Sequence, residues 1–131
     1  MYRAILITGA GSGFGEGTAI GLAKRGHNVI AAAQSWPQVT ALRNKKESQK
    51  LSGLRVEKLD LLDPHDVAHA LSWDFDVLVN NAGMGEGGPI SEIPMDLVRR
   101  NFEVNVFAPL DLTQRVVKGV APLVKTDLSS G

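Results

Sequence analysis

The sequence has 131 residues, with 14 Lys plus Arg against 14 Asp plus Glu, three His and no Cys; it predicts one domain without disulfides, thiolate catalysis or cysteine-based metal sites. Its formal net charge of zero offers no broad attraction for nucleic acid or an anionic membrane. No apolar run approaches the roughly 18 to 20 residues of a membrane-spanning helix, and the first residues leave no room for a secretion signal, so we expect a soluble, cytoplasmic protein.

The chain opens on an apolar run that breaks into a glycine-rich loop. Residues 4–7 are all apolar, which predicts a strand buried on both faces. Glycines at 9, 11, 13 and 15 then let the backbone turn sharply and approach a ligand closely. Residues 14–25 suit a helix, whose first turn presents unpaired N–H groups and the positive end of its dipole. The strand, loop and helix predict a pyrophosphate site, with a plain tight turn as the alternative.

The first helix and second strand complete a βαβ pattern. We expect Gly17 and Gly21 to let the helix lie close to the sheet, and Gly26 to end it in the left-handed conformation. Residues 28–33 are mostly apolar and predict a parallel strand covered by helices.

A second helix and a third strand follow. Ser35 can cap the helix with Pro37 in its first turn, and Gln38 completes the spacing of a capping box. The helix should run to about residue 52. Residues 54–59 alternate between apolar and polar, which predicts a strand at the edge of the sheet.

A short third helix should begin with Asp63 as its cap and Pro64 in its first turn. His65 and His69 lie four residues apart with Asp66 between them, near the spacing of the metalloprotease motif His-Glu-x-x-His. Because the glutamate is replaced and no third ligand suggests itself, we favour a plain helix and no metal site.

The fourth strand should be 77–80, followed by the turn Asn80-Asn81-Ala82-Gly83. Polar side chains at the end of a buried strand should pair with backbone groups or a ligand, and a tie between strands is the structural alternative. Residues 94–118 should form one long helix, apolar over more than one face and bent at Pro109.

Three motifs in one order carry a family resemblance: Thr8-Gly9-x-x-x-Gly13-x-Gly15, Asn80-Asn81-Ala82-Gly83 and Asn105 within the long helix. The chain resembles the short-chain dehydrogenase/reductase family, oxidoreductases that pass hydride between a nicotinamide and a carbonyl or alcohol. The resemblance implies an α/β fold with a Rossmann-like parallel sheet of order 3-2-1-4 flanked by helices. It implies a cofactor-binding domain over residues 1–119, about half of a family domain, and an atypical tail over 120–131.

The resemblance also implies an NAD(P) site. Its pyrophosphate loop would consist of Gly9, Ser12, Gly13, Phe14 and Gly15. The adenine end would consist of Ala33, Gln34, Asp60 and Leu61. Asn80, Ala82 and Gly83 would lie beside the ribose, with Asn81 mainly structural. Asn105 would be the one catalytic position carried over from the family.

Cofactor choice depends on the residues after the second strand. An acidic residue there binds the ribose 2′-hydroxyl and would repel the phosphate of NADP. This chain has Ala33, Gln34 and Ser35 instead, and Ser12 stands where the family can place a basic residue. The missing carboxylate favours NADP over NAD, with Gln34 and Ser35 as hydrogen-bond donors, and NAD stays the alternative.

The catalytic half of the family pattern is missing from the sequence. Family enzymes use a serine and a Tyr-x-x-x-Lys motif, whereas the only tyrosine here is Tyr2. Ser129 follows Lys125, Thr126 and Asp127 instead of the buried apolar run that should precede the family's serine. We therefore expect a chain that is truncated relative to the family and binds its cofactor without turnover.

A non-enzymatic nucleotide-binding or self-associating fragment is the alternative function. In the order 3-2-1-4 the fourth strand is an unpaired apolar edge, and such an edge invites pairing. The sequence therefore predicts a homodimer or larger homo-oligomer, joined through that edge or through the long helix.

Overall fold

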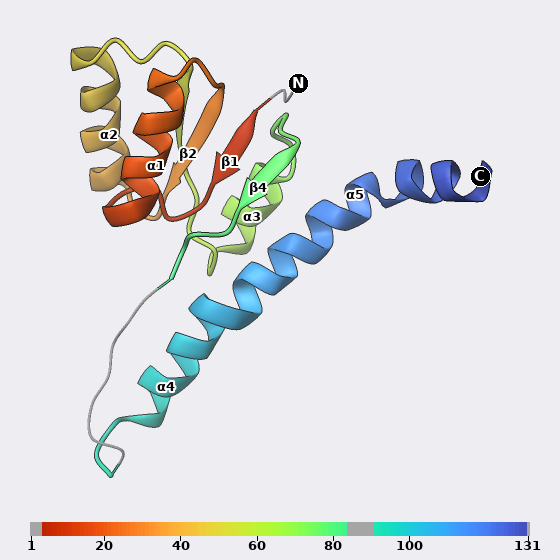
Figure 1. The fold of residues 1–131 in the computed structure, drawn as a ribbon. Coiled ribbons are helices and arrows are strands. Elements are labelled where there is room, and N and C mark those ends of the chain that lie inside the picture. The colour runs from red at the N-terminus through yellow and green to blue at the C-terminus, as the bar shows by residue number, and fades with distance from the viewer. Residues whose placement is uncertain (1–3, 84–90, 131) are drawn as a thin grey trace.

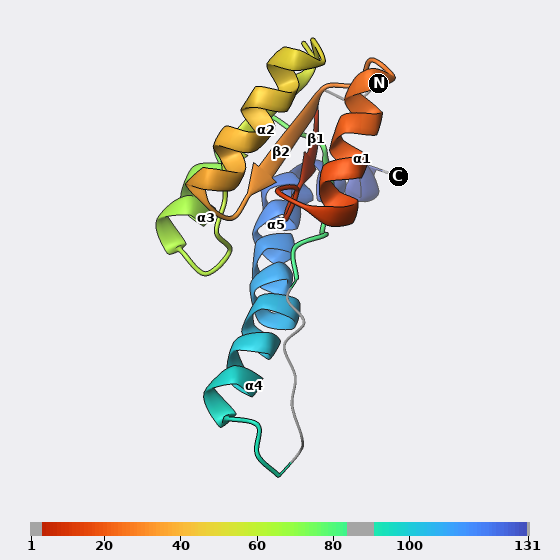
Figure 2. The same ribbon diagram turned by 90° about the vertical axis from the view of Figure 1, so that its left-hand side faces the viewer.

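The computed structural model describes residues 4–83 and 91–130. In chain order the elements are β1 (Ile5–Ile7), α1 (Gly13–Lys24), β2 (Val29–Ala33), α2 (Trp36–Ser48), β3 (Leu54–Lys58), α3 (Pro64–Ala70), β4 (Val77–Val79), α4 (Met95–Phe102), the π-helix η1 (Glu103–Phe107) and α5 (Ala108–Ser130). Figure 1 shows α1 and α2 on one side of the sheet, with α3 and α5 on the other. Figure 2, seen from the side of α1 and α2, shows α5 crossing behind the strands.

The sheet is parallel and has the order β3-β2-β1-β4, so the predicted fold class is confirmed. Leu6 at the centre of β1 pairs with Ile30 of β2 and Leu78 of β4. Each strand is one residue shorter than the segment that predicts it. Because all four strands are parallel, their carboxyl ends meet along one edge of the sheet.

Alternate residues of the strands build two apolar cores, one in each helical layer. Ile5 and Ile7 lie in the core beneath α1 and α2, together with Val39 and Leu42 of α2. The other core contains the residues Leu6, Ile30, Val67, Trp73 and Leu112, contributed by β1, β2, the α3 region and α5. Between the layers, the three consecutive alanines of β2 are completely buried (Ala31, Ala32 and Ala33).

The expected role of the glycines in α1 is wrong. Gly17 and Gly21 are exposed, and a β-carbon added at either would find nothing within 4 Å among the described residues. Ala19 and Ala23 form the buried face instead. The expectation for Gly26 is confirmed, since its φ of +90° is left-handed and its N–H bonds to the Ala23 carbonyl.

The predicted caps differ in outcome. Asp63 caps α3, because its Oδ1 accepts the N–H of His65 at 2.9 Å. The side chain of Ser35 makes no capping hydrogen bond to α2 in the described structure, so that prediction is wrong. Gln38, the expected capping-box partner, lies against Gly11 in the glycine loop.

The predicted long helix is interrupted by η1, immediately before the start of α5. Pro109 lacks the N–H that would bond to the carbonyl of Asn105, and its ring would crowd that carbonyl. A widened turn relieves this conflict, and π-helical turns often occur at such places. α5 continues to Ser130, while the division of the chain at residue 119 stays a prediction. No helix among residues 4–83 and 91–130 is long and apolar enough to cross a bilayer.

Lys50 provides a stability test. It follows α2 with a φ of +53°, and its N–H bonds to the Glu47 carbonyl while that of Leu51 bonds to Lys46. This is a Schellman motif with lysine where glycine is preferred. Lys50→Gly should raise the free energy of unfolding by about 0.5–1 kcal/mol, seen as a higher midpoint in urea. Lys50→Ala keeps the β-carbon and should give no such gain; equal gains in both variants would contradict the assignment.

Candidate functional site

A cleft of about 270 Å³ opens at the carboxyl edge of the sheet. Its walls come from the segments that follow each of the four strands, and η1 contributes Val104. The other lining residues are Gly9, Gly11, Ser12, Phe14, Gln34, Gln38, Leu59, Asp60, Leu61, Leu62, Asn81, Ala82 and Gly83. The cleft therefore lies where open parallel sheets with this topology bind ligands.

Most of the site residues expected from sequence line this cleft. They are Gly9, Ser12, Phe14, Gln34, Asp60, Leu61, Ala82 and Gly83. Ala33 is completely buried in the sheet, and neither Gly13 nor Gly15 contributes to the lining as described. Asn105 lies beside it, because its Oδ1 would be 2.9 Å from a β-carbon added at Gly83.

The glycines of the first loop allow close contacts within the protein, in addition to the close approach of a ligand that the sequence predicts. A β-carbon added at Gly9 would lie 2.6 Å from the Cα of Ala82, and Gly9 has a φ of +63°. A β-carbon at Gly15 would collide with the side chain of Asn81 and lie 2.6 Å from the Gly9 carbonyl oxygen. Gly13 has open space around it, but its φ of +59° is left-handed. Two of the motif glycines therefore let the first loop close against the turn after β4.

Thr8 joins these two segments, and its role was missed in the sequence. It is the one buried polar residue among those described, and its Oγ1 accepts the N–H groups of Asn81 and Ala82, each at 3.1 Å. Asn81 Nδ2 in turn donates to the Gly9 carbonyl at 3.0 Å. A hydroxyl at the end of an otherwise apolar strand is the signal that could have identified it.

The side chain of Asn80 is directed toward the helix α5. Its Nδ2 donates to Thr113 Oγ1 at 2.9 Å, and Thr113 donates to the Pro109 carbonyl at 2.8 Å. The structural alternative for Asn80 is a tie between strands, whereas this hydrogen bond ties β4 to the helix α5. Asn81, expected to be mainly structural, does hold the glycine loop and also lines the cleft.

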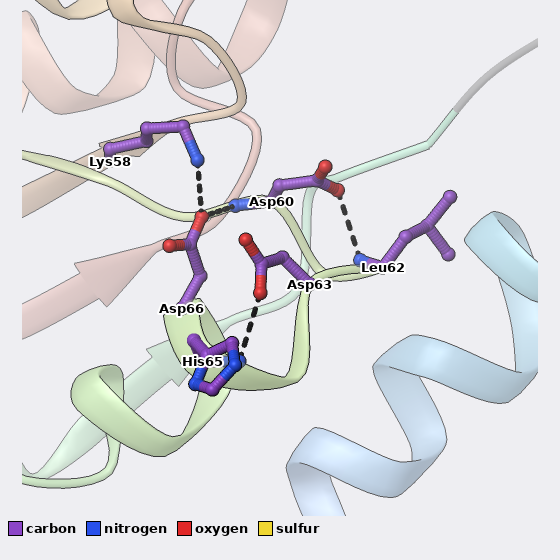
Figure 3. Close-up of polar contacts among 6 residues, drawn as sticks. All are labelled: Lys58, Asp60, Leu62, Asp63, His65 and Asp66. Carbon is purple, nitrogen blue, oxygen red and sulfur yellow. Dashed lines mark hydrogen bonds and ion pairs between the residues drawn. The ribbon is translucent and has the colours of Figure 1, made fainter.

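A network of acids and one lysine supports the segment after β3 (Figure 3). One carboxylate oxygen of Asp66, Oδ2, accepts two hydrogen bonds. One comes from the Nζ of Lys58 at 2.6 Å and the other from the N–H of Asp60 at 2.9 Å. Asp60 Oδ1 accepts the N–H of Leu62 at 2.9 Å, which closes a short turn. The main chain at Asp60, a lining residue of the cleft, is therefore held by Asp66 from the start of α3.

The Lys58–Asp66 ion pair shifts the pKa of both groups. The hydrogen bond to Asp66 raises the pKa of Lys58 above 10.5, although burial opposes this. Burial acts to raise the pKa of Asp66, but the hydrogen bond from Lys58 and the N–H of Asp60 outweigh it and lower that pKa below 3.8. The pair therefore stabilises the fold fully between pH 3.8 and 10.5. Its contribution is lost as acid protonates Asp66 or as base deprotonates Lys58.

His65 and His69 have local roles on α3. The backbone N–H of His65 donates to the capping side chain of Asp63. The ring of His69 lies edge-on to the ring of Trp73, with the ring centroids 5.7 Å apart. Among the described residues, no group of three or more His, Asp or Glu side chains is placed to hold a metal ion.

A family model described as short chain dehydrogenase matches residues 3–125. An oxidoreductase of Myxococcus xanthus is 35% identical over 113 residues, which cover 80% of this chain and 44% of that protein. This chain thus spans less than half of that relative's length.

Solved structures extend the similarity to the fold. A bulky-bulky ketone specific alcohol dehydrogenase from Comamonas testosteroni has 30% identity and a TM-score of 0.76, covering 91% of this chain and 49% of its own. A short-chain dehydrogenase from Sphingobium yanoikuyae, solved in complex with NADPH, has 30% identity and a TM-score of 0.75, covering 89% of this chain and 48% of its own.

The tight approach at Gly15 can be tested by mutation. Gly15→Ala should lower the free energy of unfolding by roughly 1–3 kcal/mol, because the Gly9 carbonyl is main chain and must shift. Gly17→Ala is the matched control two residues along α1. With open space at Gly17, alanine should stabilise the helix by up to about 1 kcal/mol. Urea unfolding measures both variants, and equal effects would contradict the packing described.

Proposed function

The chain belongs to the short chain dehydrogenase family, and from this membership we propose that its 131 residues form the NAD(P)-binding portion of an oxidoreductase. The reaction of the whole protein would pass hydride between the nicotinamide and a carbonyl or alcohol. The observation that carries the proposal is the cleft, whose walls come from the segments after all four strands.

The first turn of α1 suits a pyrophosphate. Ser12 is the N-cap residue, yet its side chain makes no capping hydrogen bond in the described structure. The N–H groups of the first turn thus have no side-chain cap, and they lie at the positive end of the helix dipole. Ser12 and Phe14 line the cleft beside them. We assign the diphosphate to this turn.

The remaining walls suit the two ends of a dinucleotide. Gln34, Asp60 and Leu61 lie together as the adenosine end. Ala82 and Gly83 line the wall on the β4 side, where we place the nicotinamide ribose. Asn105 stands against Gly83 from η1, and we propose it as the catalytic position within these residues.

The preferred cofactor is NADP. Gln34 is exposed at the cleft and replaces the carboxylate that would repel a 2′-phosphate. The side chain of Ser35 is not used in capping α2, which leaves its hydroxyl available as a donor. The relative from Sphingobium yanoikuyae was solved with NADPH, and a serine dehydrogenase of 26% identity was solved with NADP+.

Binding without turnover is the expected behaviour of this chain. The sequence contains no Tyr-x-x-x-Lys, the pair of groups that would move a proton to or from the substrate oxygen. Asn105 alone cannot replace that proton transfer.

Calorimetric titration of the purified chain with NADP+ and NAD+ tests the function and the cofactor preference. We expect both to bind, NADP+ several-fold more tightly. Gln34→Asp should weaken the binding of NADP+ by at least about ten-fold and leave the binding of NAD+ unchanged, because the new carboxylate repels the 2′-phosphate. Gln49→Asp, exposed at the far end of α2, is the control for charge alone. Absence of binding would refute the proposed function, and tighter binding of NAD+ would refute only the preference.

Self-association is the second candidate function. Large apolar side chains are between 45% and 55% exposed on the helices that follow the cleft, at Phe102, Val106, Phe107, Leu110 and Val117. The strand β4 pairs only with β1 among the described strands, so its outer edge lacks a neighbouring strand there. Exposure of this much apolar surface favours a homodimer or larger assembly.

Light scattering of the purified chain should therefore show a dimer or larger species. The double variant Phe107→Asp and Leu110→Asp should shift the mass toward the monomer if the helices form the contact. Leu71→Asp, at an exposed apolar residue that ends α3, is the control. A monodisperse wild-type monomer would refute self-association and leave the cofactor site unaffected.

A further inference from the structure

Asp66 does not line the cleft, but it holds the main chain of Asp60, which does. Its Oδ2 accepts the N–H of Asp60 at 2.9 Å, and Asp60 is followed by two more lining residues, Leu61 and Leu62. Asp60 has one carboxylate oxygen bonded to the Leu62 N–H. Within the described part of the chain, its other oxygen accepts no hydrogen bond. The turn thus leaves one carboxylate oxygen of a cleft residue without a hydrogen bond from the described residues.

Lys58 holds the carboxylate of Asp66 in place. Its Nζ lies 2.6 Å from the same Oδ2 that accepts the Asp60 N–H, and both side chains are 20% exposed. The same ammonium lies 5.9 Å from the ring centroid of Trp36, the first residue of α2. Lys58 therefore connects the α3 side of the cleft with the helix that follows Gln34. Figure 3 shows the Lys58 ammonium and the Asp60 N–H both pointing at one carboxylate oxygen of Asp66.

We propose that Asp66, held by Lys58, is a positioning residue for adenine recognition. It fixes the main chain at Asp60 so that the second carboxylate oxygen of Asp60 accepts the 6-amino group of adenine. A carboxylate accepts from an amino group but is repelled by a carbonyl oxygen, so the turn selects adenine over a base with oxygen at this position. This inference rests on the proposed function, because it presumes a dinucleotide in the cleft.

The test compares NADP+ with its hypoxanthine analogue, in which oxygen replaces the 6-amino group. The wild-type chain should bind the adenine form at least about ten-fold more tightly. Asp66→Ala should reduce this ratio to about two-fold or less, mainly by weakening the adenine form. Asp66→Asn should give an intermediate ratio, because its amide oxygen can still accept the Asp60 N–H. A purely structural defect would weaken both ligands equally and leave the ratio unchanged.

Lys58→Met supplies an independent variant if Asp66→Ala does not fold. It should lower the ratio of adenine to hypoxanthine affinity by at least about three-fold. It should also weaken the binding of NAD+ and of NADP+ to the same extent. Loss confined to NADP+ would make Lys58 a direct phosphate contact and overturn the positioning role. A wild-type ratio near one, or an undiminished ratio in the variants that fold, would also overturn it. In each of those results the chain still binds dinucleotide, whereas failure of the proposed function would appear as no binding of any form.

Discussion

The site depends on the closure of the glycine loop after β1 against the turn after β4. These segments are more than seventy residues apart in the chain, and Thr8 links them through hydrogen bonds to two successive N–H groups. The contact is possible only because Gly9 and Gly15 lack a β-carbon where Ala82, Asn81 and the loop's own carbonyl approach. The same contact gives the backbone N–H groups of Asn81 and Ala82 a hydrogen-bond partner. Thus one interaction shapes both the wall assigned to the diphosphate and the wall assigned to the nicotinamide ribose.

The parallel sheet makes that contact possible. Pairing of β1 with both β2 and β4 places the ends of three strands beside one another, so short loops can form a continuous wall. The segment after β3 adds the wall assigned to adenosine, where Asp66 supports the main chain from α3. On the opposite side, the hydrogen bond between Asn80 and Thr113 ties β4 to α5. Neighbouring elements therefore hold the main chain at Asp60 and the side chain of Asn80.

Most of the cleft could be predicted from local sequence patterns, whereas the strand order could be predicted only through the family resemblance that the three motifs carry. An apolar run, spaced glycines and the turn at residues 80–83 together indicate the parallel sheet and the site at its edge. Side-chain partners between distant elements could not be predicted in this way. Ser35 has the residue type and position of a cap, yet its hydroxyl makes no capping bond, and Gln38 lies against Gly11 instead. The π-helical turn at η1 likewise depends on how Pro109 is accommodated, which residue type alone does not specify.

The three buried alanines of β2 have a consequence for how the protein can vary. Each lies within a layer sandwiched by helices, and the carbonyl of Ala32 also receives the N–H of Ala10 from the glycine loop. A larger side chain at these positions would spread a helical layer away from the sheet, and the displacement would reach that loop. Substitutions should therefore accumulate readily on the outer faces of α1 and α2, while the middle of the sheet accepts few. The tightly packed middle of the sheet would be the slowest part of the chain to diverge.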